Sequence, residues 1–466
     1  MTVDHSGVRL VGGGKDAFAA RILLIRSARR VLDAQYYIWH DDLSGSLMLD
    51  EILAAAERGV RVRLLLDDNG IAGLDARLSQ LAGHPNIAIR LFNPFWIRRL
   101  KVLNWLFAFK RLNRRMHAKS FTVDRQCTII GGRNIGDKYF GARPKGLFED
   151  LDVMAVGPVV DQVLEAFDRH WHSRHAQSIS HVVNRVSAWA KRKSAQRAAA
   201  LAKSEAAEQY RQAVRALPFV YDMRVGSFDF TWAPIRTVST APAKGPGNAA
   251  PRTGLAELLP PGLGKAENEL ILVSGYFVPT ADGSADLQEL SRGGTRVRVL
   301  TNSFAATDVG LVHAGYAPRR KPLLESGVEL FEIPAPDDKP KTVRKFIRSG
   351  STGAPEQWGR SLHAKVYVAD RCRIYIGSAN FDPRSAHLNT ELGFVIESPA
   401  LAETLATAFE QAIRNSYRLA LASDGRLRWI DERDDVPEPE DVEPGTNAFT
   451  RALIGLLSRL PIERQL

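Results

Sequence analysis

The sequence predicts an α/β protein made of two halves of similar architecture, each a mostly parallel β-sheet flanked by helices. Three short runs and one motif in the first half reappear in the second, at offsets of about 235 to about 246 residues, which indicates a domain-sized repeat. In each half these apolar runs alternate with helical stretches, and such alternation is typical of α/β domains.

The repeated runs read as buried strands because they are rich in Val, Ile, Leu and aromatic residues. Residues 47–58 and 286–292 lie between them and show helical patterning. The matched strand pairs are 31–38 with 271–278, 59–65 with 294–300, and 89–92 with 328–331.

One short motif occurs once in each half and carries the chemistry. Its copies are His117-x-Lys119-x4-Asp124, followed by the tail Gly131-Gly132-Arg133-Asn134, and His363-x-Lys365-x4-Asp370, followed by Gly377-Ser378-Ala379-Asn380. Both copies enter strand-like runs, and side chains two positions apart on a strand face the same side. Each copy therefore offers one imidazole and one ammonium group to a common surface. A solvated strand with an incidental His and Lys is the alternative for one copy, but two matching copies disfavour it.

These residue types suit attack on a phosphodiester. Lys119 and Lys365 can neutralise the non-bridging oxygens in the transition state, and Asn134 and Asn380 can add neutral donors. One imidazole can form a covalent phosphohistidine, while the other transfers protons near neutral pH. The lysines supply the positive charge, so we expect no metal and no cofactor.

On these motifs the chain resembles the phospholipase D superfamily, and within it the bacterial cardiolipin-synthase-like branch. The resemblance extends from residue 7 to residue 466 and includes four further stretches: 36–42, 67–70, 381–385 and 460–463. It implies two pseudo-symmetric phospholipase D-like half-domains with the active site at their interface. It also implies that His117 is the nucleophile and His363 the acid/base, which the repeat itself leaves open.

The resemblance implies roles for the acidic residues as well. The aspartates that complete the motifs, Asp124 and Asp370, look structural, so we expect them to bond nearby backbone or basic groups. Matching residues 150–153 with 391–394 nominates Asp150 and Glu391 to hold the second nitrogen of each histidine, although ordinary surface acids are the alternative. The motif set is His117, Lys119, Asp124, His363, Lys365 and Asp370, supported by Asn134, Asn380, Asp150 and Glu391.

The resemblance favours a phosphatidyltransferase that makes cardiolipin from phosphatidylglycerol and a second phospholipid through a phosphohistidine. Phosphatidylethanolamine or another phosphatidylglycerol could be the donor. A phospholipase D hydrolase that releases phosphatidic acid is the nearest alternative, and a nuclease or phosphodiesterase is more distant. A non-catalytic binding module is disfavoured because both motifs are intact.

Charge and one basic segment indicate the partner. The formal net charge is +11 and the sequence pI about 9.7, which favours phosphate-rich partners. Residues 95–115 mix large apolar and basic side chains without an acid, as an interfacial helix does. A core helix with a solvated basic face, or a base-stacking groove, are the alternatives. The membrane-contact candidates are Trp96, Arg98, Arg99, Lys101, Trp105 and Phe107.

We therefore expect phospholipid substrates, an anionic membrane surface as partner and no nucleic acid. The chain has no apolar run of about 20 residues and no recognisable secretory signal, so we expect peripheral attachment to the bacterial cell membrane. Relatives often carry an N-terminal anchor, which leads us to expect that this chain is a trimmed form. The expected domains are 1–174, the first half; 175–250, a helical and loop linker; 251–430, the second half; and 431–466, an acidic connection with a C-terminal helix.

Overall fold

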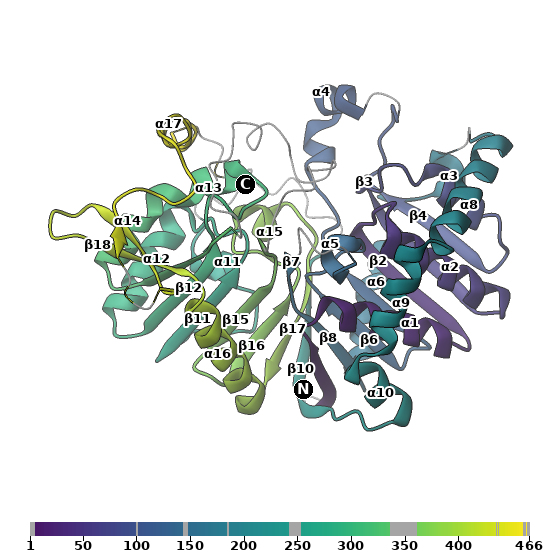
Figure 1. Cartoon of the computed structure of the whole chain (residues 1–466), viewed down its shortest axis with the longest axis horizontal. Helices are drawn as coiled ribbons and strands as arrows, with labels where there is room; N and C mark the ends of the chain where they lie inside the picture. Colours follow the sequence, from purple (N-terminus) through teal and green to yellow (C-terminus); the bar gives the residue numbers. More distant parts are fainter. Residues whose placement is uncertain are drawn as a thin grey trace. The chain divides into compact units, whose positions relative to one another are not determined.

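The computed structural model describes residues 5–98, 101–142, 148–183, 186–241, 253–335, 361–434, 436, 438–459 and 463, except the side chains of 101–103, 105, 106 and 148. The chain divides into two compact units (Figure 1). Unit 1 comprises Met1–Pro144, Asp150–Ala243 and Asn389–Gly393, and unit 2 comprises Lys145–Glu149, Lys244–Leu388 and Phe394–Leu466. Each unit thus includes a short segment from the opposite half of the sequence. The segment 334–355, rich in Pro, Lys, Asp and Gly, precedes the second motif and is predicted to be an active-site loop, but it lies almost entirely outside the described residues.

The elements up to residue 241 are β1 (His5–Val11), α1 (Gly14–Ser27), β2 (Val31–Ile38), α2 (Leu43–Glu57), β3 (Arg61–Gly70), α3 (Asp75–Leu81), β4 (Ile87–Phe92), α4 (Lys101–Leu112), β5 (Ser120–Val123), β6 (Cys127–Gly131), α5 (Asp137–Phe140), β7 (Phe148–Glu149), β8 (Asp152–Val156), α6 (Val159–Trp171), β9 (Ala176–Ser178), α7 (Ile179–Val182), α8 (Ala188–Ala202), α9 (Glu205–Arg215), α10 (Pro218–Val225) and β10 (Thr231–Ser239).

The later elements are α11 (Leu255–Leu258), β11 (Glu269–Ser274), α12 (Thr280–Arg292), β12 (Arg296–Asn302), α13 (Gly310–Tyr316), the short 3₁₀ helix η1 (Ala317–Arg319), α14 (Arg320–Glu325), β13 (Glu329–Ile333), β14 (Ser361–Leu362), β15 (Lys365–Ala369), β16 (Arg373–Gly377), α15 (Pro383–His387), β17 (Leu392–Glu397), α16 (Pro399–Ile413), β18 (Tyr417–Leu421), β19 (Leu427–Asp431), β20 (Pro439–Glu440) and α17 (Ala448–Leu457).

The sheet of unit 1 has a parallel centre and antiparallel flanks. Strands β2, β3 and β4 run parallel. At one edge, β9 pairs antiparallel with β4. On the other side of β2 the strand order is β5, β6, β8, β1 and β10, and each strand is antiparallel to its neighbour. The predicted α/β class is confirmed, and the sheet is mixed because parallel pairing is confined to the strands joined by helical crossovers.

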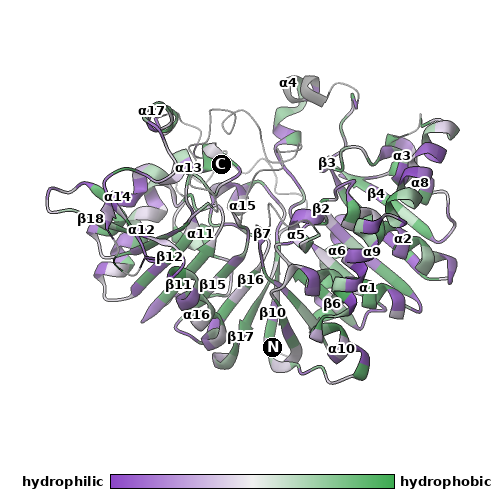
Figure 2. Ribbon diagram, viewed as in Figure 1, coloured by the Kyte–Doolittle hydropathy of each residue, from purple (hydrophilic) through white to green (hydrophobic). Residues whose placement is uncertain are grey.

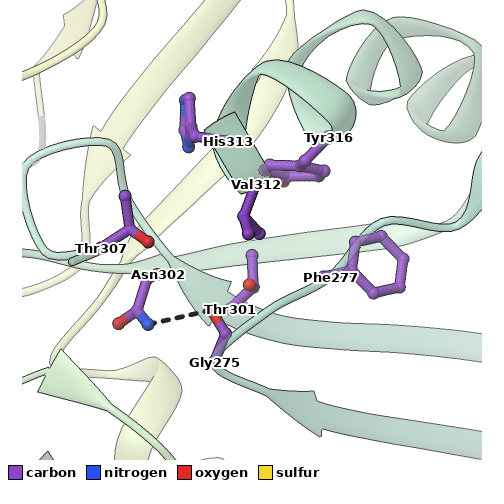
Figure 3. Close-up of a pocket in the computed structure, with 8 residues that line it drawn as sticks. All are labelled: Gly275, Phe277, Thr301, Asn302, Thr307, Val312, His313 and Tyr316. Atoms are coloured by element: carbon purple, nitrogen blue, oxygen red, sulfur yellow. Dashed lines mark hydrogen bonds between the residues drawn. The ribbon is translucent and has the colours of Figure 1, made fainter. Parts of the chain in front are cut away.

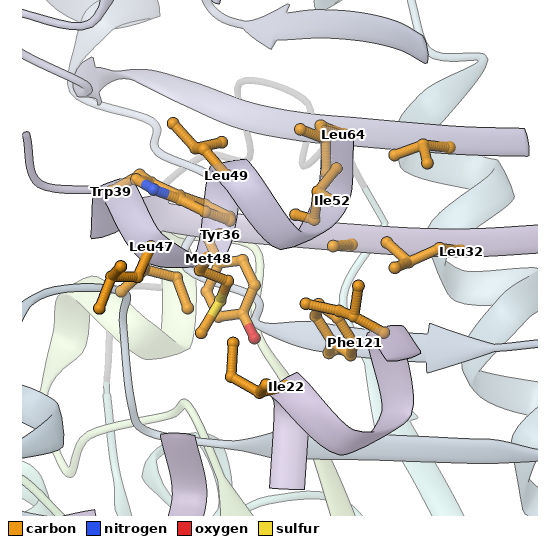
Figure 4. Close-up of a cluster of buried hydrophobic side chains, with 14 of the residues drawn as sticks. Ile22, Leu32, Tyr36, Trp39, Leu47, Met48, Leu49, Ile52, Leu64 and Phe121 are labelled. Atoms are coloured by element: carbon orange, nitrogen blue, oxygen red, sulfur yellow. The ribbon is translucent and has the colours of Figure 1, made fainter. Parts of the chain in front are cut away.

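Helices cover both faces of this sheet. α1 and α2 pack together over one face, and α6 packs on the strands of the other. Alternate residues of β2 (Leu32, Ala34 and Tyr36) are fully buried against the first helical layer (Figure 4). The alternation places Tyr37 on the opposite face from Tyr36, and this orientation matters at the candidate site.

The sheet of unit 2 repeats this plan. Strands β11, β12 and β13 are parallel, with β15 and β16 antiparallel beside β11, and β18, β19 and β20 beyond β13. In both units the strands are largely hydrophobic and the outer sides of the helices carry hydrophilic residues (Figure 2).

The structure corrects one detail of the predicted repeat. The backbone N–H of Asp124 donates to Val31, and that of Asp370 donates to Glu269. Residue 31 therefore corresponds to 269 and not to 271. A shift of two residues keeps every side chain on the same face of a strand, so the apolar pattern alone could not detect it.

The described part of the predicted linker, residues 175–183 and 186–241, belongs to unit 1. Its helical stretch contains several helices, and Ser204 caps the start of α9, where its hydroxyl accepts a hydrogen bond from Ala207 N. Tyr210 and Val214 of α9 are buried in the core of the unit. Among the described residues, no helix combines the length and apolar character needed to cross a bilayer.

Candidate active site

The motif aspartates close tight hairpins. Asp124 and Arg125 have φ values of 52° and 59°, and Asp370 and Arg371 have 51° and 49°. Two successive residues of positive φ between antiparallel strands are typical of a type I′ turn. The Asp124 carboxylate accepts hydrogen bonds from the backbone N–H groups of Arg29, Arg30 and Val31 at 2.8, 2.7 and 2.9 Å.

Asp370 does the same with the N–H groups of residues 267, 268 and 269. Burial favours protonation of Asp124 and Asp370, but the backbone donors outweigh it and lower the pKa of both carboxyls. Both carboxylates thus bond nearby backbone groups, and we propose a structural role for them in place of a catalytic one.

A second pair of side chains fixes the residue that precedes each motif histidine. The buried Asp67, where the pairing of β3 with β4 ends, accepts a hydrogen bond from Met116 N at 2.9 Å and pairs with Arg115 at 3.2 Å. In unit 2, Asn302 at the end of β12 accepts from Leu362 N at 2.9 Å. Both act at the carboxyl ends of parallel strands, where α/β sheets bind ligands.

His117 is held by groups of unit 1 on both its backbone and its ring. Its N–H donates to the carbonyl of Thr390 at 2.9 Å. Its Nδ1 lies 2.9 and 3.1 Å from the two carboxylate oxygens of Glu391. Glu391 is itself buried, and its N–H donates to the hydroxyl of Thr240 at 2.5 Å. A carboxylate on Nδ1 places the proton there, so Nε2 carries the lone pair that can attack phosphorus.

Two further groups surround this imidazole. Lys119 is buried, and its Nζ donates to the carbonyl of His117 at 2.5 Å. The Tyr37 ring packs edge-on against the His117 ring, with 5.3 Å between the ring centres, and its hydroxyl accepts from Asn69 Nδ2 at 3.2 Å. The site thus combines an oriented imidazole with a buried ammonium group in a polar, partly enclosed setting.

The tail of the first motif has a packing role. The guanidinium of Arg133 donates to the carbonyls of Val11, Gly12 and Asp150, and so fixes the backbone at Asp150. A side chain at Gly132 could not fit, because its Cβ would lie 2.4 Å from Asp150 Oδ1. Gly132 therefore lets the buried Asp150 carboxylate approach the motif.

The predicted donor role of Asn134 is not favoured. Its Oδ1 accepts from Ile38 N at 3.1 Å, and its Nδ2 donates to the Tyr139 hydroxyl at 3.0 Å. This carboxamide therefore links the last residue of β2 to α5. Asn380 is also buried, and its N–H donates to the hydroxyl of Ser385 at 3.1 Å.

The second motif has the same backbone plan within unit 2. The N–H groups of His363 and Ala364 both donate to the carbonyl of Glu149, at 2.7 and 3.0 Å. Lys365 is buried, and its Nζ donates to the carbonyl of His363. Glu149 is thus the counterpart of Thr390, and the residue after it, Asp150, is the counterpart of Glu391.

Sequence reasoning missed the roles of Tyr37, Asp67 and Thr240. The first two lie in stretches that were noted only for their resemblance to the family branch. A signal was present for Asp67, since it follows an apolar strand whose repeat ends in Asn302. Nothing in the sequence pattern singles out Thr240, which lies far from both motifs.

The basic segment contains a helix that stands apart from those covering the sheet (Figure 1). α4 rests on a small separate cluster of Phe95, Ala108 and Leu112. Trp96 and Phe107 expose 68% and 79% of their surface. Arg98, however, pairs with Asp68 and Asp75, so its guanidinium is engaged within the unit. Arg99 and the side chains of Lys101 and Trp105 lie outside the described residues.

The surroundings of His117 and of His363 are now described, and comparison with known proteins defines the class of protein. The chain matches the family described as "Cardiolipin synthase, PLD-like domain" over residues 22–171 and 261–413, one match in each half. It therefore belongs to that family, and it is an enzyme of the phospholipase D type.

Individual relatives agree with this assignment. The chain is 44% identical to cardiolipin synthase C of Escherichia coli K12 over 449 residues, which cover 96% of this chain and 93% of the relative. It is 30% identical to an uncharacterized protein of Helicobacter pylori 26695, covering 99% and 90% of the two chains. The crystal structure of phosphatidylserine synthase from Haemophilus influenzae Rd KW20 shares the fold, with a TM-score of 0.60, 15% identity, and coverage of 99% and 95%.

Proposed function

We propose that this protein is a phosphatidyltransferase that makes cardiolipin from phosphatidylglycerol and a second phospholipid through a phosphohistidine intermediate. The observation that carries the proposal is the Glu391 carboxylate on Nδ1 of His117, beside the buried Lys119. Similarity to a relative named cardiolipin synthase C over nearly the whole of both chains supports the choice of lipid.

In the first step, Nε2 of His117 attacks the phosphorus of the donor lipid. A P–N bond forms, the P–O bond to the donor's head-group alcohol breaks, and His363 gives that oxygen a proton. Lys119 and Lys365 offset the charge on the non-bridging oxygens. Glu391 stabilises the positive charge that the His117 ring gains when it is phosphorylated.

In the second step, a hydroxyl of phosphatidylglycerol attacks the same phosphorus. The P–N bond breaks, a P–O bond to the acceptor forms, and the acceptor's proton passes to His363. The cycle returns both histidines to their starting states. It requires both motifs to act on one phosphate, and we keep Asp150, the counterpart of Glu391, as the proposed carboxylate partner of His363.

We also propose that the exposed side chains of α4 and its preceding loop contact an anionic membrane surface. Trp96, Ile97, Phe107 and Phe109 are all exposed. The Arg111 guanidinium lies 4.6 Å from the centre of the Trp96 ring. Exposed aromatic residues beside basic ones favour insertion among anionic head groups. Arg98 is left out of this surface because Asp68 and Asp75 engage it.

Lipid turnover by mass spectrometry tests the proposal. Purified protein is incubated with vesicles of phosphatidylglycerol and phosphatidylethanolamine, with His117→Ala as the control. We expect cardiolipin with the wild type and none with the variant, and release of free ethanolamine would identify phosphatidylethanolamine as the donor. Phosphatidic acid as the sole product would contradict transfer in favour of hydrolysis. Cleavage of single-stranded DNA without lipid turnover would overturn the proposal altogether.

A further inference from the structure

The two units share their sheet plan but differ at one position close to the motif. The correspondence of β2 with β11 matches Tyr37 with Gly275. The isolated bridges formed two residues later, by Trp39 in unit 1 and by Phe277 in unit 2, agree with this match. An aromatic ring in unit 1 thus stands where unit 2 has no side chain.

The ring of Tyr37 contacts both the histidine and the lysine of the first motif. Its centre lies 5.3 Å from the centre of the His117 ring and 5.8 Å from Nζ of Lys119, which lies over the ring. A cation within about 6 Å of an aromatic face is attracted by the electron density of the ring. One side chain therefore restrains both the imidazole and the ammonium group.

The end of β3 holds Tyr37 in place. The Tyr37 hydroxyl accepts from Asn69 Nδ2 at 3.2 Å, and the N–H of Asn69 donates to Asp67 Oδ1 at 2.9 Å. Gly70 permits the close approach of the two strands, because a Cβ there would collide with the carbonyl oxygen of Tyr37. Since Asp67 also binds Met116 N, this series of contacts begins and ends at the motif.

Unit 2 cannot place a ring at the matching position. A Cβ on Gly275 would collide with the carbonyl oxygen of Leu362, the residue before His363. Asn302 fixes this close approach, because its Nδ2 donates to the carbonyls of Gly275 at 3.0 Å and Leu362 at 2.8 Å. Figure 3 shows Gly275 and its hydrogen bond with Asn302 where β11 and β12 end. The two motif histidines, which the repeat treats alike, therefore differ at this contact.

Glu391 and Tyr37 restrain the His117 imidazole in different ways. The Glu391 carboxylate fixes the tautomer and the direction of Nδ1, but one hydrogen bond leaves the ring able to tilt about it. Tyr37 lies against the ring and limits that tilt. Attack on phosphorus requires Nε2 to be aligned with the bond that breaks, and a small misplacement of an attacking atom slows a reaction strongly.

We infer that Tyr37 is a positioning residue that commits His117 to nucleophilic attack. The inference rests on one step of the proposed function, the attack of His117 on phosphorus. Because Gly275 cannot supply a ring, the contact also gives a physical reason why the first motif, and not the second, provides the nucleophile.

The attack step can be measured alone with vesicles that contain phosphatidyl-p-nitrophenol and with His363→Ala protein. Nε2 of His117 forms the P–N bond, the P–O bond to p-nitrophenol breaks, and p-nitrophenolate leaves with the electron pair. This leaving group needs no proton from His363, so the step proceeds without it. The colour gives the rate constant of attack and the amount released in the burst, which counts active molecules. A folding defect lowers the amount, whereas misplacement of the imidazole lowers the rate constant.

Three substitutions are compared in this background. Tyr37→Leu removes the ring, so the rate constant should fall by about 10- to 100-fold while the amount stays the same. Tyr37→Phe keeps the ring and loses only the hydroxyl contact with Asn69, so its rate constant should stay close to that of the parent protein. Tyr221→Leu, on the exposed surface of α10, is the matched control and should change neither quantity.

Two results would overturn the inference alone. The first is Tyr37→Leu with an unchanged rate constant, whatever the amount released, because His117 would then attack without help from the ring. The second is Tyr37→Phe that is as slow as Tyr37→Leu, because the hydroxyl and not the ring would then act.

The proposed function can fail separately. Phosphatidic acid in place of cardiolipin from wild type, with the loss in Tyr37→Leu still observed, would overturn the proposed transfer and support this inference. Absence of a burst and of an adduct on His117 in the parent protein would overturn both.

Discussion

At the scale of single residues, His117 depends on groups that are distant in sequence. Glu391 binds its Nδ1, Thr390 binds its backbone, and Asp67 holds the residue before it. Each of these groups restrains His117 from a position other than Nε2, the atom proposed to attack phosphorus. They are positioning residues, and their loss should lower turnover more than it lowers stability.

Glu391→Gln tests this positioning. The amide keeps the shape of the side chain but no longer enforces the Nδ1–H tautomer or stabilises a charged imidazole, so kcat for lipid turnover should fall by about 100-fold or more. Steady-state kinetics on mixed vesicles measures the change. Glu57→Gln, on the exposed surface of α2, is the control and should be neutral. A Glu391→Gln enzyme with wild-type kcat would show that the carboxylate does not orient His117.

Asp124→Asn should act on stability instead. The carboxylate accepts three backbone hydrogen bonds at the hairpin, so its replacement should cost about 1–3 kcal/mol of unfolding free energy. Activity per folded molecule should stay within about threefold of the wild-type value. Urea unfolding and turnover at low temperature measure the two effects. A large loss of kcat in fully folded protein would restore Asp124 to the catalytic set.

Asp67 should give a pH-dependent signature. Burial raises the pKa of this carboxyl to about 6, against the opposing pull of Arg115 and of two backbone donors. A raised folded-state pKa means that its contribution to stability is present below about pH 4 and is lost as the pH rises through about 6.

Asp67→Asn removes that titration and keeps an acceptor for Met116 N, as Asn302 does in unit 2. Wild type should therefore become less stable relative to Asp67→Asn as the pH rises from about 4 to about 6. Thermal unfolding of both proteins across this range measures the difference. A stability difference between the two proteins that does not change with pH, or that changes in favour of wild type as the pH rises, would contradict the raised pKa.

At the scale of elements, the motif hairpins and their parallel neighbours followed from the sequence because β-branched runs and turn residues specify them locally. The residue-by-residue correspondence between β2 and β11 in the repeat did not follow from the sequence. A shift of two residues leaves every apolar side chain on the same face of the strand. The break between α8 and α9 was also missed, although Ser204 followed by Glu205 and Glu208 is a recognisable helix start.

The element that should meet the membrane is α4. Phe107→Ser removes an exposed aromatic residue without disturbing a core, so folding should be unaffected and binding to phosphatidylglycerol vesicles should weaken by about tenfold. Vesicle sedimentation measures the partition. Trp189→Ser, an equally drastic change at an exposed position of α8, is the control. Equal effects of both substitutions would point to non-specific adsorption.

At the scale of the whole molecule, each unit contains a short segment from the opposite half of the sequence, and that segment contacts its motif histidine. Unit 1 receives Asn389–Gly393, which brings Glu391 to His117, and unit 2 receives Lys145–Glu149, which brings Glu149 to His363. The repeat pointed to the motif residues and to the contact of Glu391 with His117, whereas Asp150 as the partner of His363 stays a prediction. The exchange of segments was not, because it depends on contacts between residues more than 200 positions apart, such as His117 with Glu391.

The measurement that tests the central claim most directly is the identification of the covalent intermediate. Wild-type protein and His363→Ala are mixed with donor vesicles, quenched by denaturation at alkaline pH, digested, and mapped by mass spectrometry. A phosphodiester-derived adduct on the peptide that contains His117 is the predicted result, and His117→Ala should lack it. An adduct on His363, or rapid lipid turnover with no adduct on either histidine, would contradict the assignment of His117 as the nucleophile.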